Sequence, residues 1–148
     1  MEIRMANISD AAIFFEMNEL FNGPGYNSLE MIQESVEYNQ QEIVAIAYEK
    51  DTAVGFACAQ IIWSMCYDVK YAEITELFVK EPFRKKGFGR GLINFLEKTF
   101  VQQGIYDFQL LTGEDNTGAQ RFYEKMGYAR DRELMYRKRL KRETVQDT

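Results

Sequence analysis

Two kinds of hydrophobic pattern run along the chain, and each predicts a type of secondary structure. Apolar residues that recur every three or four positions are typical of amphipathic helices, whereas short apolar or alternating runs are typical of strands. The helical pattern occurs at about residues 10–21, 28–38, 89–103 and 117–126. The strand pattern occurs at about residues 1–5, 43–49, 54–65, 70–79, 105–111 and 128–137.

The order of these elements predicts a single α/β domain over residues 1–148. Three strands follow one another closely between residues 43 and 79 and are expected to form an antiparallel meander. Helices precede and follow this meander, so we expect a central mixed sheet, mostly antiparallel, with helices packed on both faces. Residues 138–148 form a polar tail that is expected to fray.

The strand at 70–79 has an irregular spacing of apolar residues. Ile74 and Leu77 are three positions apart, so strict alternation slips by one residue between them. Such a slip indicates a β-bulge, which inserts one extra residue into a strand. The alternative is a strand that is buried on both faces and has no bulge.

Composition narrows the chemistry. The chain has 11 Phe, 9 Tyr and only 2 Pro, which excludes a disordered protein. It has no histidine, which excludes Ser-His-Asp and Cys-His catalysis and any histidine-based metal site. Cys58 and Cys66 cannot by themselves hold a zinc ion, so we expect no metal and two buried, reduced thiols. The longest uncharged run, 52–67, has 16 residues. Because a membrane span needs about 20, we expect a cytoplasmic protein that does not enter a membrane.

Charge is divided unevenly along the chain. The formal net charge of −5 is the sum of −10 over residues 1–79 and +5 over residues 80–148. An acidic half and a basic half suggest two binding partners of opposite sign. Chance clustering of solvated side chains is the alternative.

The basic half begins with a glycine-rich segment, RKKGFGRGL at 84–92, between an apolar strand and an amphipathic helix. Glycine lets the backbone turn tightly and approach a ligand. The helix that follows offers unpaired N–H groups and the positive end of its dipole. These features predict an anion site suited to a pyrophosphate. The segment is not a Walker loop and fits the dinucleotide pattern GxGxxG poorly, although Asp107 has about the right spacing for a ribose acid. A solvated turn without a ligand is the alternative.

The same segment carries a resemblance to a known family. The run RKKGFG at 84–89, after LFV at 77–79, resembles the [QR]-x-x-G-x-[GA] signature of the GNAT superfamily of acetyl-CoA-dependent N-acetyltransferases. A second block at 116–128, which reads NxxAxxFYxxxGY, is similar to the family's other conserved block at every position. The resemblance covers nearly the whole chain. It implies the GNAT fold, acetyl-CoA as acetyl donor and an enzyme that acetylates an amine.

The resemblance also implies how the cofactor is held. In the family, a bulge separates two strands, and the pantetheine arm pairs with free backbone groups, here at 77–79. Backbone N–H groups at about 85–90 would bind the pyrophosphate, with Arg84 closing the turn. Asn116 would bind the pantetheine amide or only cap its helix, and Tyr123 would be the general acid for the thiolate or a core residue. The residues expected to contact acetyl-CoA are Leu77, Phe78, Val79, Arg84, Lys85, Lys86, Gly87, Phe88, Gly89, Arg90, Asn116 and Tyr123.

A base is also needed, because the acceptor amine is an ammonium at pH 7. Without histidine, a carboxylate must accept the proton, directly or through water. Glu76 lies at the expected bulge and is the predicted base, with Glu73 of the same strand as a second candidate. A structural or substrate-orienting carboxylate, with water as the base, is the alternative.

The acidic half favours a small cationic acceptor, such as an aminoglycoside or a polyamine, which would attack the thioester directly in a ternary complex. The alternatives are acetylation of protein lysines or N-termini, and a CoA-binding regulatory domain without turnover. The basic run at 137–142 raises the question of nucleic-acid binding, but the acidic pI of 4.9 argues against it. A homodimer is compatible with the sequence, although no interface can be identified in it.

Overall fold

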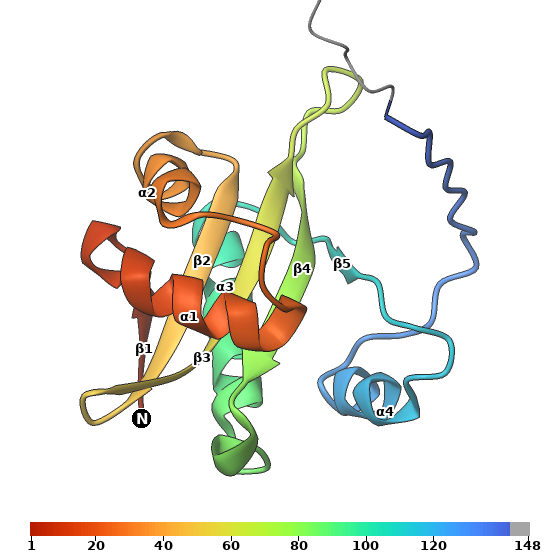
Figure 1. The fold of residues 1–148 in the computed structure, drawn as a ribbon. Helices are drawn as coiled ribbons and strands as arrows, with labels where there is room; N and C mark the ends of the chain where they lie inside the picture. The colour runs from red at the N-terminus through yellow and green to blue at the C-terminus, as the bar shows by residue number, and fades with distance from the viewer. Residues whose placement is uncertain (143–148) are drawn as a thin grey trace, which may run out of the picture. The chain divides into compact units, whose positions relative to one another are not determined.

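The computed structural model describes residues 1–142, whose packing divides them into a unit of residues 1–113 and a unit that begins at Glu114. Residues 143–148, the end of the expected polar tail, lie outside the described residues. The first unit contains a five-stranded sheet in the order β1-β2-β3-β4-β5 (Figure 1). Neighbouring strands are antiparallel from β1 to β4, and β5 is parallel to β4. The strands are β1 (Glu2–Met5), β2 (Glu42–Glu49), β3 (Thr52–Ile62), β4 (Tyr71–Val79) and β5 (Phe108–Leu110).

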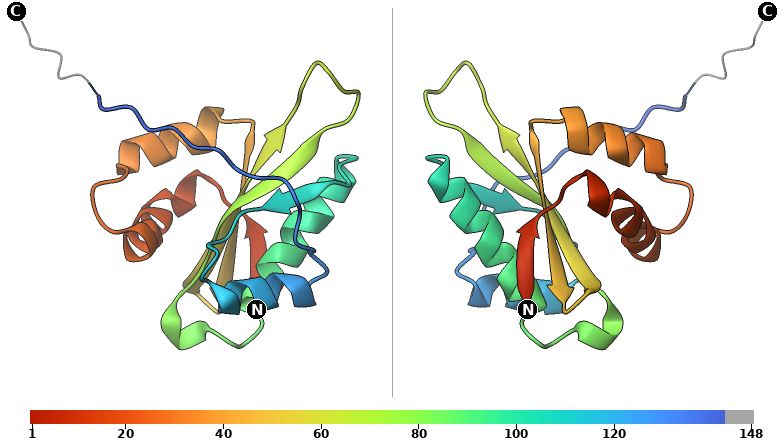
Figure 2. Two further views of the ribbon diagram at one scale, coloured as in Figure 1. Left: turned by 90° about the vertical axis from the view of Figure 1, so that its right-hand side faces the viewer. Right: turned by 90° about the vertical axis from the view of Figure 1, so that its left-hand side faces the viewer.

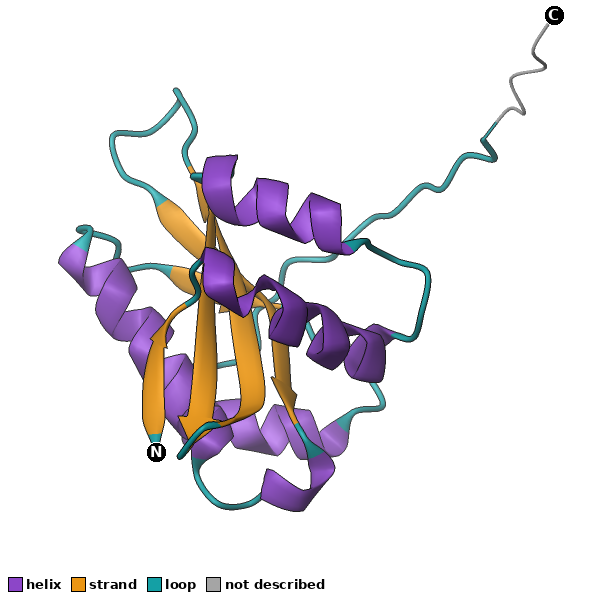
Figure 3. Ribbon diagram, turned by 60° about the vertical axis from the view of Figure 1, so that its left-hand side comes forward, coloured by secondary structure: helices purple, strands orange, loops and turns teal. Residues whose placement is uncertain are grey.

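Three helices of the first unit cover the two faces of this sheet. Helices α1 (Ala11–Asn22) and α2 (Leu29–Tyr38) lie on one face, and α3 (Phe88–Gln102) lies on the other (Figures 2 and 3). Helix α2 begins where the pattern predicts, because the Ser28 hydroxyl accepts a hydrogen bond from the Met31 N–H. The mixed, mostly antiparallel sheet with helices on both faces is therefore confirmed.

The two faces of the sheet carry side chains of different size. The face under α3 has fully buried alanines in the two central strands: Ala45, Ala47, Ala57 and Ala59. Large apolar residues of α3, among them Leu92, Leu96 and Phe100, are fully buried. The face under α1 carries Ile46, Phe56 and Phe78, which pack with Met17 and Phe14 of that helix. The alternation of strand side chains thus builds two cores of different character.

A partly buried ion pair ties the start of the chain to this second core. Asp10, which is 3% exposed, accepts two hydrogen bonds of 2.7 Å from the Arg4 guanidinium. It also accepts hydrogen bonds from the Tyr48 hydroxyl at 2.8 Å and the Asn7 backbone N–H at 2.8 Å. The bond with Arg4 is the main reason that the pKa of Asp10 falls to about 2.

The second unit contains one helix, α4 (Thr117–Lys125), among its described residues. The Asn116 side chain accepts a hydrogen bond from the Ala119 N–H at 3.2 Å and caps the helix. The predicted strand at 128–137 is wrong: these residues form neither helix nor strand. Four consecutive charged residues at 130–133 interrupt the alternation that a half-buried strand requires.

Other predicted elements are present with different bounds. The strand expected to reach residue 65 ends at Ile62, and the one expected over 105–111 is limited to β5. On α1, the pattern places Leu20 and Phe21 in the core, yet they are 67% and 41% exposed. None of the helices within residues 1–142 has both the length and the apolar character that crossing a membrane requires.

Candidate functional site

The predicted β-bulge is confirmed in the middle of β4. Cys58 of β3 pairs with Glu76, whereas the next residue, Ala59, pairs with Ile74, so Thr75 is the extra residue. The Thr75 hydroxyl donates a hydrogen bond to the Cys58 carbonyl at 3.3 Å and contacts the Glu76 carboxylate. The bulge changes the alternation of β4 side chains at this point.

One consequence of the bulge is that Glu73 and Glu76, three positions apart, lie on the same face of the sheet. Glu73 pairs with Gln60 and Glu76 pairs with Cys58, and these two β3 residues share the face covered by α1 and α2. The Glu73 carboxylate accepts a hydrogen bond from the Gln109 side-chain amide at 3.2 Å. The carboxylate of Glu76, the predicted base, contacts the Thr75 hydroxyl of the bulge instead.

A second consequence concerns the edge of β4 that faces β5. The two strands pair only at Ala72, Glu73 and Ile74, and they diverge beyond that point (Figure 1). Within the described residues, therefore, no strand pairs with the β5-facing edge of β4 from Thr75 to Val79. Free backbone groups on an extended edge can pair with an extended ligand as if it were a further strand. This edge includes residues 77–79, where the resemblance puts the pantetheine arm, although the Val79 carbonyl already accepts a hydrogen bond from Arg84 Nε.

The glycine-rich loop joins the end of β4 to the start of α3. A short 3-10 turn (Glu81–Phe83) follows β4, and the Arg84 side chain then donates a hydrogen bond from Nε to the Val79 carbonyl at 2.8 Å. Arg84 thus closes the turn, as predicted. Gly87 has a φ of 91° and occupies the N-cap position of α3 without a capping side chain. The first N–H groups of α3 are free to bind an anion.

Positive side chains surround this helix start. Arg84, Lys85, Lys86 and Arg90 are all exposed, and Phe88 is buried and anchors the first turn. The glycines of this loop were expected to let the backbone approach a ligand, but Gly91 has a different role. A Cβ at this position would lie 2.6 Å from Ile3 Cδ1. It allows the first turn of α3 to pack closely against β1.

A third carboxylate, Glu42, was not identified by sequence reasoning. Glu42 on β2 pairs with Gln60, and Gln60 pairs with Glu73, so the three share one sheet face. The Gln60 amide donates to the Glu42 carboxylate at 3.0 Å. Burial, and then the charge of Glu76, raises the pKa of Glu42. Only the register of three strands reveals this proximity, because 34 positions separate Glu42 from Glu76 in the chain.

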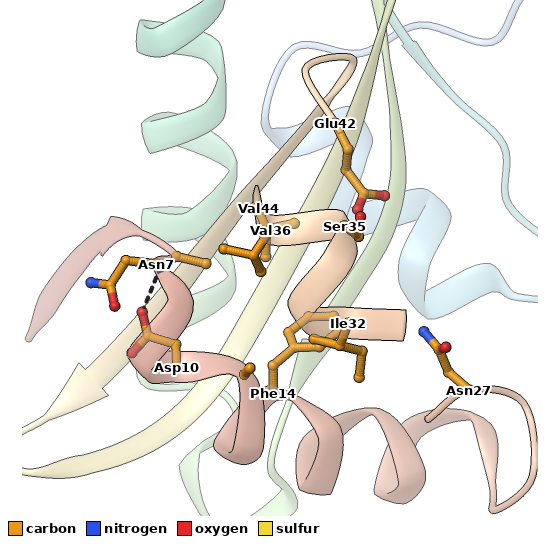
Figure 4. Close-up of a pocket in the computed structure, with 11 residues that line it drawn as sticks. Asn7, Asp10, Phe14, Asn27, Ile32, Ser35, Val36, Glu42 and Val44 are labelled. Atoms are coloured by element: carbon orange, nitrogen blue, oxygen red, sulfur yellow. Dashed lines mark hydrogen bonds between the residues drawn. The ribbon is translucent and has the colours of Figure 1, made fainter. Parts of the chain in front are cut away.

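Glu42 also borders a small cavity between α1, α2 and β2 (Figure 4). The cavity has a volume of about 60 Å³, which is enough for a few water molecules. Figure 4 shows Glu42 near Ser35 of α2, away from Asp10 and Asn7. The Glu42 carboxylate therefore has space beside it for water, although its own strand is in the sheet interior.

The two cysteines differ from each other. Cys58 is buried on the same face as Glu76, and the pKa of its thiol is raised well above the usual value by burial and then by the charges of Glu42 and Glu76. It remains a neutral thiol, as expected of a small core residue. Cys66 is exposed, so the prediction that both thiols are buried is wrong for this one. Among the described residues, no group of three or more potential ligands could hold a metal ion.

Tyr123 and Asn116 belong to the second unit. Tyr123 lies on α4, with its ring at 5.2 Å from that of Phe122 and at 6.0 Å from that of Tyr128. Burial raises the pKa of its hydroxyl above the ordinary value near 10. The structure therefore brings together Glu73, Glu76, the 77–79 edge and the glycine-rich loop in one unit, and the roles of Asn116 and Tyr123 rest on the sequence block that contains them.

Comparison with known proteins identifies relatives along most of the chain. The model of the acetyltransferase (GNAT) family matches residues 12–128. An uncharacterized N-acetyltransferase of Chlorobaculum tepidum is 32% identical over 126 residues, which cover 85% of this chain and 74% of the relative. An acetyltransferase of Yersinia enterocolitica is 29% identical over 143 residues, covering 95% of this chain and 96% of that protein.

Solved structures share the fold. An aminoglycoside acetyltransferase from an uncultured soil metagenomic sample, in complex with trehalose, superposes with a TM-score of 0.85 at 18% identity and covers 95% of this chain and 96% of that one. The structure of AAC(6')-Iy with a bisubstrate analogue of CoA and acetylneamine superposes with a TM-score of 0.80 at 23% identity, covering 94% and 98%. At these identities the likeness concerns the fold.

Proposed function

Because this chain belongs to the GNAT family of acetyltransferases and uses acetyl-CoA as its acetyl donor, we propose that it acetylates a primary amine of a small cationic acceptor. Aminoglycosides and polyamines are the acceptor classes proposed first. The acceptor amine attacks the thioester directly in a ternary complex, without an acyl-enzyme. The family predicted from the two sequence blocks is confirmed by the comparisons.

The observation that carries the proposal is the free edge of β4 after the bulge, followed by the free N-terminus of α3. The chain's groups fit acetyl-CoA, since an extended pantetheine arm needs unpaired backbone groups and a pyrophosphate needs N–H donors and cations. We assign the arm to residues 77–79 and the phosphates to residues 84–90. When bound, acetyl-CoA supplies the activated acetyl group. A backbone N–H at 77–79 is suited to stabilise negative charge on the carbonyl oxygen.

We propose Glu76 as the group that accepts the proton of the acceptor ammonium. It lies at the bulge, next to the free edge, and its carboxylate is on the face covered by α1 and α2. Glu73 is held by Gln109 and is better suited to orient a cation than to accept a proton. The cavity beside Glu42 has room for water, and we assign to it the route by which the proton leaves the site.

Tyr123 is proposed to hold a proton for the departing sulfur. Burial raises its pKa, so the hydroxyl is protonated at neutral pH, as an acid must be. Asn116 caps α4 with its side-chain oxygen, and its amide N–H groups can still bind a pantetheine carbonyl. Both assignments rest on the match of residues 116–128 to the family's block.

Three observations support a small cationic acceptor. Glu42, Glu73 and Glu76 share one sheet face, which attracts an ammonium. One structural neighbour, solved in two complexes, is named as an aminoglycoside acetyltransferase. A relative from Arabidopsis thaliana, named as an L-ornithine N5-acetyltransferase, is 37% identical over 54 residues, which cover 36% of this chain and 24% of that protein.

Thermal unfolding with and without acetyl-CoA tests the cofactor site. A ligand present at 100 times its Kd adds about 2.7 kcal/mol to the free energy of unfolding, which corresponds to a rise in Tm of roughly 5–10 °C for a chain of this size. We expect this rise with acetyl-CoA and none with NAD or ATP. A larger shift with NAD or ATP would contradict the assignment of residues 84–90. Release of free CoA in a panel of amines then tests turnover, and no CoA should be released before an amine is added.

A further inference from the structure

A cavity of about 380 Å³ opens beside the candidate site, between the end of α1, the end of β4 and the turn that follows it. It lies within the first unit and is larger than the cavity next to Glu42. Its volume falls in the range of pockets that hold small molecules. Its walls include Leu20, Phe21, Phe78, Lys80, Glu81 and Pro82.

The walls explain an anomaly of α1. Leu20 and Phe21 are 67% and 41% exposed, although the periodicity of the helix places them with the core. Phe21 packs edge-on against Phe56 and Phe78, with ring centroids 5.9 and 5.4 Å apart, and the rings of Phe56 and Phe78 are stacked at 5.7 Å. Phe21 and Phe78 thus form an apolar wall, with the fully buried ring of Phe56 packed against both. Large apolar side chains left beside a cavity gain free energy when a ligand covers them.

Glu76 does not line the cavity but lies near Phe78, which does. Phe78 and Glu76 lie on the same face of β4, two positions apart and beyond the bulge, so their Cα atoms are separated by about 7 Å. An amine whose ammonium contacts Glu76 can therefore extend its remaining atoms over the ring of Phe78. This direction leads into the cavity.

The charged residues at the rim of the cavity limit which part of an acceptor can lie in it. Three charged residues line the cavity: Lys80, Glu81 and Arg84. Because Arg84 is assigned to the phosphates of acetyl-CoA, Lys80 and Glu81, which carry opposite charges, are left to face the acceptor. A second ammonium there would lose hydration against the apolar side chains without a net attraction in return, whereas an uncharged hydrocarbon group covers these side chains favourably.

We propose that this cavity holds the apolar body of the acceptor, so the preferred acceptor is a monoamine that carries a hydrocarbon chain or ring. This inference rests on the proposed function: it keeps the reaction and the cationic amine, and it replaces polyamines and aminoglycosides as the preferred acceptors, because both carry further ammonium groups. Phe21, Phe78 and Leu20 then determine specificity, whereas Glu76 contacts the reacting nitrogen.

Matched amines test the inference. Pentylamine and 1,5-diaminopentane have the same chain and differ in one ammonium, and 2-phenylethylamine adds a ring. We expect kcat/KM at least about tenfold higher for pentylamine and 2-phenylethylamine than for the diamine. The Leu20→Ser variant should raise KM for 2-phenylethylamine several-fold and leave KM for methylamine unchanged. Met31→Ser, which removes an exposed side chain of α2 away from the cavity, is the matched control.

Direct binding separates this inference from the proposed function. Titration of 2-phenylethylamine into the CoA-bound protein, followed by calorimetry, should show binding that Leu20→Ser weakens and Met31→Ser does not. Binding of this kind without turnover would support the cavity and overturn the proposed reaction. Preference for the diamine, or binding of 2-phenylethylamine that is absent or unaffected by Leu20→Ser, would overturn the cavity's role even if other amines were acetylated.

Discussion

At the scale of single residues, the chain performs amine chemistry without histidine. Three carboxylates share one sheet face, and their partners differ: Gln60 binds Glu42, Gln109 binds Glu73, and the Thr75 hydroxyl of the bulge contacts Glu76. A base must be able to approach the substrate proton, and Glu76 is the one that lies at the bulge, next to the edge assigned to the pantetheine arm.

Substitution of the two β4 carboxylates should therefore give unequal effects. Glu76→Gln is expected to lower kcat about 100-fold, since loss of a general base costs 10² or more in rate. Glu73→Gln is expected to act mainly on the KM of the amine. Both variants should keep the rise in Tm that acetyl-CoA produces. Equal losses of kcat in steady-state assays of the two variants would contradict the assignment of Glu76 as base.

Asp10 gives a prediction about stability rather than activity. Its pKa of about 2 lies below the ordinary value of 3.8, so the folded state gains stability from the ionised form. This gain is complete above about pH 4 and is lost as pH falls through about 2. Asp10→Asn removes the main ionic partner of Arg4, which keeps a contact of 3.8 Å with Glu2, and should cost about 2 kcal/mol at pH 7. Urea unfolding at several pH values should show the two proteins converging near pH 2, and a pH-independent difference would contradict the role of the ion pair.

At the scale of elements, the shape of β4 depends on its neighbour β3. A Cβ at Gly55 would lie 2.5 Å from the Phe78 carbonyl oxygen and 3.2 Å from Val79 Cα. Backbone atoms cannot move aside as the end of a side chain can. Gly55 therefore lets β4 lie close to β3 at the residues assigned to the pantetheine arm.

Gly55→Ala is expected to destabilise the protein by about 2 kcal/mol, since overpacking a core costs 1–3 kcal/mol, and to raise KM for acetyl-CoA. The control is Gly118→Ala, because a Cβ there has no heavy atom within 4 Å in the described structure and alanine favours the helix. That variant should be as stable as the parent or slightly more stable. Chemical denaturation and acetyl-CoA titration measure both effects, and unchanged values for Gly55→Ala would contradict this account of β4.

The elements also show which features of the fold and of the site can be predicted from the sequence. The bulge follows from the spacing of Ile74 and Leu77, and the anion loop follows from its glycines and charges, because both features are local. The proximity of Glu42 to Glu76 depends on register across three strands, which no local pattern specifies. The exposure of Leu20 and Phe21 was missed because periodicity identifies one face of a helix but not what covers each part of that face.

At the scale of the whole molecule, the division of charge along the sequence corresponds to a cluster in the structure for the basic residues but not for most of the acidic ones. The basic residues at 84–90 surround the start of α3, as predicted. The acidic residues of the first half are dispersed, and only Glu42, Glu73 and Glu76 meet at the site. The prediction of a strand at 128–137 was wrong, because it relied on the hydrophobic residues there and ignored the four charged residues at 130–133. Residues 1–148 as a single domain remain a prediction.

The two unlike faces of the sheet have a consequence for evolution. On one face, fully buried alanines pack against α3, which carries the anion loop at its start, so larger side chains cannot replace these alanines without displacing the helix. The opposite face, with its aromatic rings, carboxylates and open cavity, contributes little to that contact. Changes there can alter which amine is accepted while the donor site keeps its geometry. A sheet built in this way allows side chains on the α1 face to change during evolution while α3 and the start of the anion loop stay in place.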